Sequence, residues 1–471
     1  MTVSRRAASF EAMSLRHGPR YRWLVLLVVG LGTVAGVLAT TSFTVAVPAL
    51  MADFGVGQAQ VQWTMTGFMA AMTVGMLPTA WLLDRLGLRR LFLGAVTLLG
   101  LSGLAGYFST DFSLVVGLRI VQGAAAGVLQ PLATIAVMRL FPTGEQGRAS
   151  GLLGFGIVLA PALAPTLGGM LLDRFGWPAI FLINLPACLL AAGLGFYLLP
   201  QPREIVRRDF DWIGLGLLTL TSLALVEAIA SLQQGARLGW SAGLFALAAL
   251  LLRGFVVHAR KASHPIISLG AFAHPAFTMG TVVCFAYGFG LYASTYLIPV
   301  FLQHALHFSA TAAGLALLPS GLVLALTIPL AGHLVDRYSP LRVTIAGLVL
   351  FCLSFLFFAR VAEHISYAQI VVATILGRIG LGLILPALSI ATLRPLAREQ
   401  IGQSSVIVSY VRQLGGVMGV AIAAVFVAWR EAVHGPAAGG VFQAYADGFL
   451  LVAGVFLLAM VAAGFVRARP A

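Results

Sequence analysis

Three arginines and one glutamate lie inside long apolar runs of this chain, where a charged side chain is costly. Arg119, Arg378 and Arg412 are the basic residues, and Glu227 is the acid within a run. At the centre of a membrane helix an arginine costs about 2.5–3.5 kcal/mol on insertion scales, so it usually faces a cavity or a partner. An acid at that depth is a candidate proton-binding group. Alternatively, Arg119 reaches the nearer interface, where Asp111 lies, and Glu227 reaches the outer interface.

A short charged segment, DRLGLRR at 84–90, combines one acid with several bases. Asp84 can pair with Arg85 or Arg89, or cap the N-terminus of a neighbouring helix. A loop that only followed the excess of basic residues on one side of a membrane would need arginines alone. We therefore expect a conformational latch, formed in one state of the molecule and released in another.

The stretch GLLGFGIVLAPALAPTLGGML at 151–171 is unusually rich in glycine and proline for a helix. Prolines kink helices, and glycines let two helix backbones approach closely. We expect a kinked helix with a small-residue face, which suits a bundle that moves between conformations. The residues concerned are Gly151, Gly154, Gly156, Pro161, Pro165, Gly168 and Gly169.

Hydroxyl side chains cluster in the first apolar run, GVLATTSFTVAVPALMADF at 36–54. Thr40, Thr41, Ser42 and Thr44 stand close together, and no charge follows until Asp53. These hydroxyls either line a central cavity or bond to carbonyls of their own helix.

The composition shows what must position these groups. Of 471 residues, 60% are hydrophobic and only 9% are charged, whereas soluble domains carry about 25% charged residues. The apolar runs are roughly twenty residues long, enough for a helix to cross a hydrocarbon core about 30 Å thick. Runs without alternation indicate helices rather than a barrel. We predict an all-α polytopic membrane protein.

Several other classes of protein are excluded by the same composition. The net charge of +14 does not indicate nucleic acid, because the arginines fall between apolar runs rather than in one stripe. Cys188, Cys284 and Cys352 lie within apolar runs and have no metal-ligand spacing. The nine histidines are scattered, and no P-loop sequence is present. We expect no enzyme, ATP drive, metal or cofactor.

Fourteen membrane spans fit the apolar runs, and an even number places both termini on one side. The loops on that side hold most of the 29 lysines and arginines, which identifies it as the cytoplasm. The outer loops hold only Arg174, Arg237, Arg360 and Arg430. The predicted spans are 23–48, 62–83, 91–109, 112–138, 149–172, 178–199, 212–232, 240–258, 277–302, 310–334, 342–361, 368–391, 403–429 and 444–466.

Three sequence echoes, each about 250 residues apart, divide the chain into two related halves. LLDRLGLRR (82–90) is echoed by LVDRYSPLR (334–342), EQGRAS (145–150) by EQIGQS (399–404), and LRIVQG (118–123) by GRIGLG (377–382). The predicted parts are a cytoplasmic tail (1–22), an N-terminal six-helix bundle (23–199), a linker with two inserted spans (200–258), a cytoplasmic loop (259–276), a C-terminal six-helix bundle (277–466) and a short tail (467–471).

Nearly the whole chain resembles the major facilitator superfamily, specifically its fourteen-span drug:proton antiporters. AWLLDRLGLRR is similar to the signature between spans 2 and 3. Its matching residues are Asp84, Arg85, Gly87 and Arg89, with Ala80 where glycine is usual.

Further signatures of the family fall in later spans. RIVQGAAAG (119–127) is similar to the span 4 signature, which makes Arg119 its key basic residue. WPAIFLINLP (177–186), DFDWIGLGLL (209–218) and VRQLGGVMG (411–419) are typical of this branch. The span 5 antiporter signature fits Gly151, Pro165, Gly168 and Gly169, with Ala160 and Ala164 replacing two glycines.

In one place the first span departs from the family pattern. Relatives commonly carry an aspartate there, followed by hydroxyls and an asparagine. Ala39 stands where the aspartate is usual, and Thr44 where the asparagine is usual. In relatives with that aspartate it is implicated in coupling or cation recognition, so this chain lacks one such group.

The resemblance implies a secondary exporter of drugs or other amphipathic small molecules in the inner membrane of a bacterium. Two halves would rock about a central site, with protons as the coupling ion. Glu227 or Asp173 would then bind the proton, with Arg119 assisting. A periplasmic adaptor and an outer-membrane component are candidate partners. The alternative is an exporter or facilitator of one metabolite with altered or no proton coupling, and a polytopic enzyme or channel is a different class.

Aromatic and polar side chains of several spans are candidates to line the substrate cavity. Simple packing is the alternative for each aromatic residue. The candidates are Thr40, Thr41, Thr44, Trp63, Phe68, Gln122, Phe285, Tyr287, Tyr292, Tyr296 and Arg412.

Overall fold

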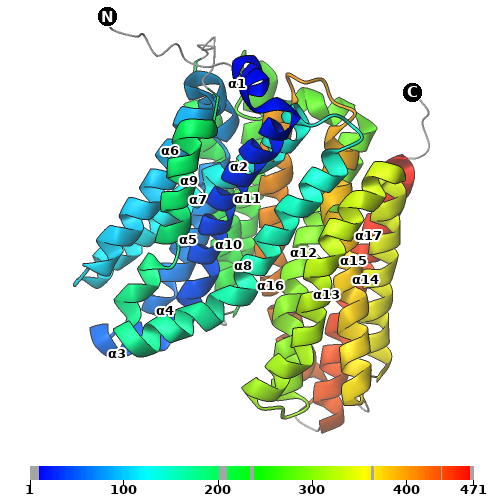
Figure 1. The fold of residues 1–471 in the computed structure, drawn as a ribbon. Helices are drawn as coiled ribbons and strands as arrows, with labels where there is room; N and C mark the ends of the chain where they lie inside the picture. The colour runs from blue at the N-terminus through cyan, green and yellow to red at the C-terminus, as the bar shows by residue number, and fades with distance from the viewer. Residues whose placement is uncertain (1–9, 201–208, 234–237, 362–364, 436–437, 467–471) are drawn as a thin grey trace, which may run out of the picture.

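The computed structural model describes residues 10–200, 209–233, 238–361, 365–435 and 438–466, which form a bundle of helices (Figure 1). The N-terminal half contains α1 (Phe10–His17), α2 (Tyr21–Thr41), η2 (Ser42–Ala46), α3 (Val47–Phe54), α4 (Gln58–Val61), α5 (Trp63–Met76), α6 (Thr79–Tyr107), α7 (Phe112–Leu140), α8 (Gln146–Phe175), η3 (Trp177–Leu182) and α9 (Leu185–Leu198). The inserted hairpin is α10 (Trp212–Gln233) and α11 (Leu238–Lys261). The C-terminal half contains η4 (Leu269–Ala273), α12 (Pro275–His304), α13 (Ala310–Arg337), α14 (Pro340–Val361), α15 (Tyr367–Leu393), α16 (Ile401–His434) and α17 (Ala438–Val466).

Twelve helical segments of the described chain are long and apolar enough to cross a membrane. They correspond to the predicted spans except those in α5 and α8. Helix α5 has only 14 residues, and α8 is an unbroken helix of 30 residues. The all-helical membrane fold is therefore confirmed, whereas the number of fourteen spans stays a prediction.

The predicted loop between the second and third spans, 84–90, contains the break in α6. A break that was not predicted lies within the second span, because α5 ends at Met76 and α6 begins at Thr79, directly after Pro78. Proline lacks an amide hydrogen and disrupts the interior of a helix but is tolerated at its start. The only interruption within α6 is Gly87, with φ 75° and ψ 164°, a conformation that glycine adopts readily. The charged segment is therefore helical on both sides of one glycine.

The first span also ends differently from the prediction. Helix α2 stops at Thr41, a 3-10 turn follows, and α3 continues to Phe54. Pro48 was expected to mark the end of the span, but it lies in the first turn of α3. That position needs no amide donor, so proline is accommodated there.

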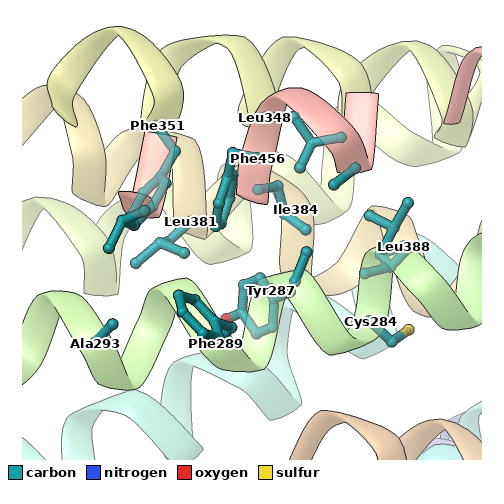
Figure 2. Close-up of a cluster of buried hydrophobic side chains, with 14 of the residues drawn as sticks. Cys284, Tyr287, Phe289, Ala293, Leu348, Phe351, Leu381, Ile384, Leu388 and Phe456 are labelled. Atoms are coloured by element: carbon teal, nitrogen blue, oxygen red, sulfur yellow. The ribbon is translucent and has the colours of Figure 1, made fainter. Parts of the chain in front are cut away.

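One hydrophobic core lies within the N-terminal half, and a second fills the C-terminal half and extends to Leu77 and Met138 of the N-terminal half and to the inserted hairpin. Figure 2 shows part of this second core. The rings of Phe351 and Phe456 lie 4.1 Å apart between α14 and α17. Helices α12 and α16 approach so closely that a Cβ on Gly288 would overlap the carbonyl of Arg412. Small residues permit this contact, which brings the backbone of an intramembrane arginine against α12.

The near end of the bundle is defined as the one that holds the start of α2 and the C-terminus of α17. The opposite end is called the far end. The near end is at the top of Figure 1. Helix α8 of the N-terminal half and α13 of the C-terminal half pack together there and diverge towards the far end. The junction of the two halves is therefore asymmetric between the two ends.

Candidate functional site

Asp336 of α13 joins the two halves at the near end. Its Oδ1 accepts a hydrogen bond from the Gly147 amide over 2.7 Å, and its Oδ2 accepts one from the Arg148 amide over 2.8 Å. These amides belong to the first turn of α8, where a carboxylate fills empty donor positions and is favoured by the helix dipole. Arg394 donates to the carbonyl oxygen of Thr143 over 2.8 Å. In the described chain these are all the hydrogen bonds between α1–α9 and α12–α17.

The near half of α8 lies against α13 through glycines. A Cβ on Gly147 would overlap the carbonyl of Gly332, and a Cβ on Gly151 would lie 2.9 Å from the Ile328 carbonyl oxygen. Any larger residue at Gly147 would therefore push the two halves apart.

The far half of α8 packs within its own half instead. A Cβ on Gly168 would lie 3.0 Å from the Val45 side chain, whereas a Cβ on Gly169 would meet open space. The close approach expected of this glycine-rich stretch is thus found at Gly151 and Gly168 but not at Gly169. The expected kinks do not break the helix, because α8 continues through Pro161 and Pro165.

The charged segment at 84–90 does not form its expected internal ion pairs. Arg85 stacks over the Trp81 ring at 5.0 Å, and Arg89 stacks over the Phe196 ring at 4.6 Å. Asp84 is half-buried, and no hydrogen bond or ion pair joins it to another described residue.

Asp84 nevertheless lies beside a helix start in the other half. It lines a cavity together with Arg139 of α7 and Gln403 in the first turn of α16. In the sequence repeat, this turn of α16 corresponds to the turn of α8 that Asp336 caps. Asp336 is a residue that the motifs alone did not single out, although the echo between 82–90 and 334–342 contains the signal.

Arg119 is enclosed inside the N-terminal half, with 1% of its surface exposed. Its Nε donates to the Thr64 carbonyl oxygen over 3.1 Å. Its Nη1 donates to the Ala39 carbonyl oxygen over 2.8 Å and to the Gln122 side chain over 3.0 Å. Its Nη2 is buried without a partner among the described residues. It does not reach Asp111, which caps the first turn of α7.

Two aromatic rings complete the surroundings of this guanidinium. The rings of Phe43 and Phe68 each lie 4.2 Å from the Arg119 Cζ atom, a cation–π arrangement. Phe68 and Gln122 were candidates for an open cavity, but both are buried beside Arg119. All of the groups around Arg119 are neutral.

The hydroxyls of the first span bond to their own helix. Thr40 donates to the Gly36 carbonyl oxygen over 2.9 Å, and Thr41 donates to the Val37 carbonyl oxygen over 3.0 Å. Thr44, which is exposed, donates to the Thr41 carbonyl oxygen over 2.8 Å. Of the two roles considered for these hydroxyls, the structure shows the bonds within the helix.

Two arginines of the C-terminal half converge on α12. Arg378 of α15 and Arg412 of α16 are half-buried, and neither forms a hydrogen bond or ion pair with a described residue. Both interact electrostatically with Tyr287 of α12. Tyr292 packs its ring against Gly416 of α16, where a Cβ would lie 2.6 Å from the ring. Of the predicted cavity residues in this half, Tyr292, Tyr296 and Arg412 are half-buried, whereas Tyr287 is buried in the hydrophobic core.

The two carboxylates predicted to bind protons lie away from these arginines. Glu227 is exposed on the face of α10 that also carries Leu220 and Leu223. Asp173 is exposed in the last turn of α8 at the far end, and Trp63 is exposed at the far end of α5. Among the described residues, no group of three His, Cys, Asp or Glu side chains is arranged to hold a metal ion.

A cluster of titratable residues at the far end of the C-terminal half was not predicted. Asp447 of α17 accepts hydrogen bonds from Arg430 over 2.6 Å and His434 over 3.0 Å. Glu431 lies 3.5 Å from the His304 Nδ1 atom. Asp447 lies within the predicted span 444–466, although only Glu227 was singled out as an acid within a span, and its pairing with α16 depends on packing between the two helices.

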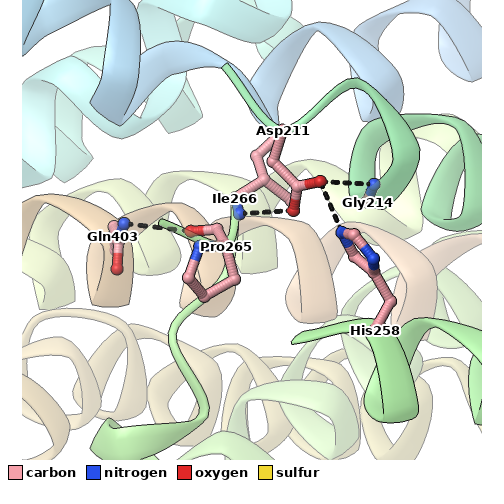
Figure 3. A network of polar contacts seen from close by, with 6 residues as sticks. All are labelled: Asp211, Gly214, His258, Pro265, Ile266 and Gln403. Atoms are coloured by element: carbon pink, nitrogen blue, oxygen red, sulfur yellow. Dashed lines mark hydrogen bonds and ion pairs between the residues drawn. The ribbon is translucent and has the colours of Figure 1, made fainter. Parts of the chain in front are cut away.

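Asp211 fastens the inserted hairpin at the near end (Figure 3). Its Oδ1 lies 2.8 Å from the Gly214 amide and 2.7 Å from the His258 Nε2 atom, and its Oδ2 accepts from the Ile266 amide over 3.0 Å. Burial alone would raise the pKa of this carboxyl, but its hydrogen bonds hold the pKa below the usual value. Gln403 of α16 donates to the Pro265 carbonyl oxygen over 3.4 Å, and this bond joins the hairpin to the C-terminal half.

Comparison with known proteins agrees with this architecture. The sequence model of the Major Facilitator Superfamily matches residues 29–280 and 280–471. The multidrug resistance protein B homolog of Mycobacterium tuberculosis is 33% identical over 416 residues, which cover 86% of this chain and 77% of that protein. The riboflavin transporter RibZ of Clostridioides difficile is 27% identical over 410 residues, covering 87% of this chain and 89% of that protein.

Solved structures show the same fold. The proton:xylose symporter XylE has a TM-score of 0.66 to this chain at 15% sequence identity, covering 93% of this chain and 95% of that one. The helical halves, the family match over almost the whole sequence and the similarity to a curated relative lead to one conclusion. The chain belongs to the Major Facilitator Superfamily, a family of membrane transporters and not of enzymes.

Proposed function

We propose that this protein is a secondary exporter of drugs or other small amphipathic molecules that works by alternating access. The observation that carries this proposal is the asymmetry between the two ends: the hydrogen bonds that join the halves in the described chain lie at the near end. Two halves that rock about a central site close one end while they open the other. A relative named as a multidrug resistance protein supports drugs as cargo.

In this proposal the near end is cytoplasmic, because most of the basic residues lie in the loops on that side. Helices α5 and α8 complete a set of fourteen spans in the inner membrane of a bacterium. The conformation described above is then closed to the cytoplasm by Asp336 and Arg394. Asp84 is the second latch, which bonds to α16 in another state. A periplasmic adaptor and an outer-membrane component remain candidate partners.

Two candidate functions differ in the energy source for transport. Proton antiport needs a carboxylate that protons and substrate occupy in turn, and Glu227 and Asp173 are the candidates, with Arg119 assisting. The second candidate is an exporter or facilitator of a specific metabolite with altered or no proton coupling. The exposed positions of both acids and a relative named as a riboflavin transporter favour the second candidate.

Transport by the purified full chain in proteoliposomes tests the proposal. We expect saturable movement of at least one solute from a panel of amphipathic dyes and metabolites, above the rate in empty liposomes. If Glu227 couples protons, Glu227→Gln abolishes proton flux driven by substrate, while Glu399→Gln in the near-end loop leaves it unchanged. A transport rate that changes neither with the pH gradient nor in Glu227→Gln supports the second candidate. Absence of transport for every solute contradicts export itself.

A further inference from the structure

The charges inside the two six-helix halves do not balance. Two acids, Glu431 and Asp447, lie within helices near the far end, and both already have basic partners. Asp447 accepts hydrogen bonds from Arg430 and His434. Glu431 lies beside His304. The other described acids of these halves lie at or near helix ends or in loops. Three arginines within the spans have no such partner.

Arg119 carries one uncompensated charge in the N-terminal half. Its acceptors are two backbone carbonyls and the amide of Gln122, and its Nη2 donors have no partner among the described residues. The position at which an acid would lie next to it is occupied by Ala39, whose carbonyl contacts the guanidinium.

Arg378 and Arg412 carry two more charges, and these are accessible. Each is half-buried, and the described chain provides neither a hydrogen bond nor an ion pair to either guanidinium. Their helices, α15 and α16, both pack against α12, and both charges act on Tyr287 of that helix. Arg412 also acts on Tyr292. Two guanidiniums on helices that pack against α12 therefore have no hydrogen-bond partner in the described chain.

We propose that the exported molecule is an organic anion whose acidic group binds Arg378 and Arg412. This inference rests on the proposed export function and names its class of cargo. Guanidinium forks match the oxygens of a carboxylate, sulfonate or phosphate, and a charge removed from water needs a counter-charge. The described residues supply no counter-charge to these two arginines, so the ligand brings it. The ring of the half-buried Tyr292 contacts the apolar body of the ligand, and Arg119 adds positive potential from the other half.

The same arrangement explains how export is driven without a central acid. An anion that leaves a cell with a negative interior moves down the membrane potential. A carrier of anions therefore needs no carboxylate to bind a proton, and export is electrogenic.

Two xanthene dyes of opposite charge test the class of cargo. Carboxyfluorescein is the anion and rhodamine 123 is the cation, each loaded into proteoliposomes that contain the full chain, with the potential set by potassium and valinomycin. We expect carboxyfluorescein to leave faster when the interior is negative.

Arg412→Gln should slow the exit of carboxyfluorescein about tenfold, the effect of losing one charge-assisted hydrogen bond, and Arg412→Lys should keep part of the rate. Arg360→Gln, exposed at the end of α14, is the matched control and should change nothing.

The outcomes separate this inference from the proposed function. Movement of rhodamine 123 without carboxyfluorescein overturns the anionic cargo and leaves export intact. Exit of carboxyfluorescein at an unchanged rate in Arg412→Gln and Arg378→Gln overturns the binding site. Movement of neither dye overturns the inference alone when another solute of the amphipathic panel moves, and contradicts export as well when no solute moves.

A chemical probe of the local potential gives a second, transport-free readout. A cysteine introduced by Tyr292→Cys should react faster with the anionic sulfonatoethyl methanethiosulfonate than with its cationic trimethylammonium analogue. We expect this rate ratio to exceed that at Arg360→Cys about tenfold and to fall when Arg412→Gln is added. The parent chain is the blank, because Cys188, Cys284 and Cys352 are buried. Equal ratios at the two positions, or reaction with neither reagent at position 292, overturn the inference.

Discussion

At the scale of single residues, the contact between Ala39 and Arg119 decides the charge of the N-terminal half. The Ala39 carbonyl lies 2.8 Å from the Arg119 Nη1 atom, so a side chain at position 39 starts beside the guanidinium. The family pattern that the sequence resembles places an aspartate at this position, and such a side chain would neutralise the arginine. With alanine, the arginine keeps its charge and is held by neutral acceptors and two aromatic rings.

Restoring the acid by Ala39→Asp should shift the exporter away from anions. The aspartate would be stabilised in its charged form by the neighbouring guanidinium, and the positive potential of the half would fall. We expect the ratio of carboxyfluorescein to rhodamine 123 transport to drop about tenfold, roughly 1.4 kcal/mol of altered preference. Ala39→Asn, which has a similar size and no charge, should leave the ratio near that of the parent. A ratio that Ala39→Asp does not change contradicts this role of position 39.

At the scale of elements, the junction of α8 and α13 holds the near end closed. Gly147 and Gly332 allow the backbones to touch, and Asp336 caps the first turn of α8 from the opposite half. The equivalent acid of the first half, Asp84, faces the start of α16 without a bond. The two copies of one motif therefore differ in this conformation.

Removing the charge by Asp336→Asn should open the near end. A charged cap contributes about 1 kcal/mol, so its loss shifts the closed population about fivefold. Pulsed electron paramagnetic resonance between labels at Gly144→Cys and Arg398→Cys would show a larger share of long distances. Asp84→Asn is the matched control and should not increase the share of long distances, because Asp84 makes no bond in the closed state. Identical distributions for Asp336→Asn and the parent would refute the latch at α8.

The inserted hairpin should lose stability in acid. Hydrogen bonds hold the pKa of Asp211 below its usual value, so its contribution is present above the unfolded pKa of about 3.9 and is lost as pH falls through the lower folded value. Asp211→Asn should lower the melting temperature in detergent at pH 7 by a few degrees. The difference from the parent should shrink below about pH 4. A difference that is the same at pH 3 and pH 7 would contradict this linkage, and Asp209→Asn is the neighbouring control.

At the scale of the whole molecule, hydropathy and repeat spacing predicted the helical membrane fold and its two halves. Hydropathy is a local property, because a spanning helix needs only a long apolar run. The break at Gly87 lies within the predicted loop 84–90, whereas the break at Pro78 was not predicted, because apolar residues continue through it. The partners of Arg119, the exposed face of Glu227 and the bridge from Asp336 depend on packing between distant helices, which no local pattern encodes.

The central claim is that the near end must open and close during each transport cycle. Thr143 and Arg394 face one another across the two halves there, 2.8 Å apart at their bonded atoms. The most direct measurement is transport in proteoliposomes by a Thr143→Cys, Arg394→Cys chain treated with a short bismaleimide that contains a cleavable disulfide, with each single variant as control. We predict that cross-linking stops transport and that reduction restores it, whereas transport at the full rate through the cross-linked protein would contradict the account.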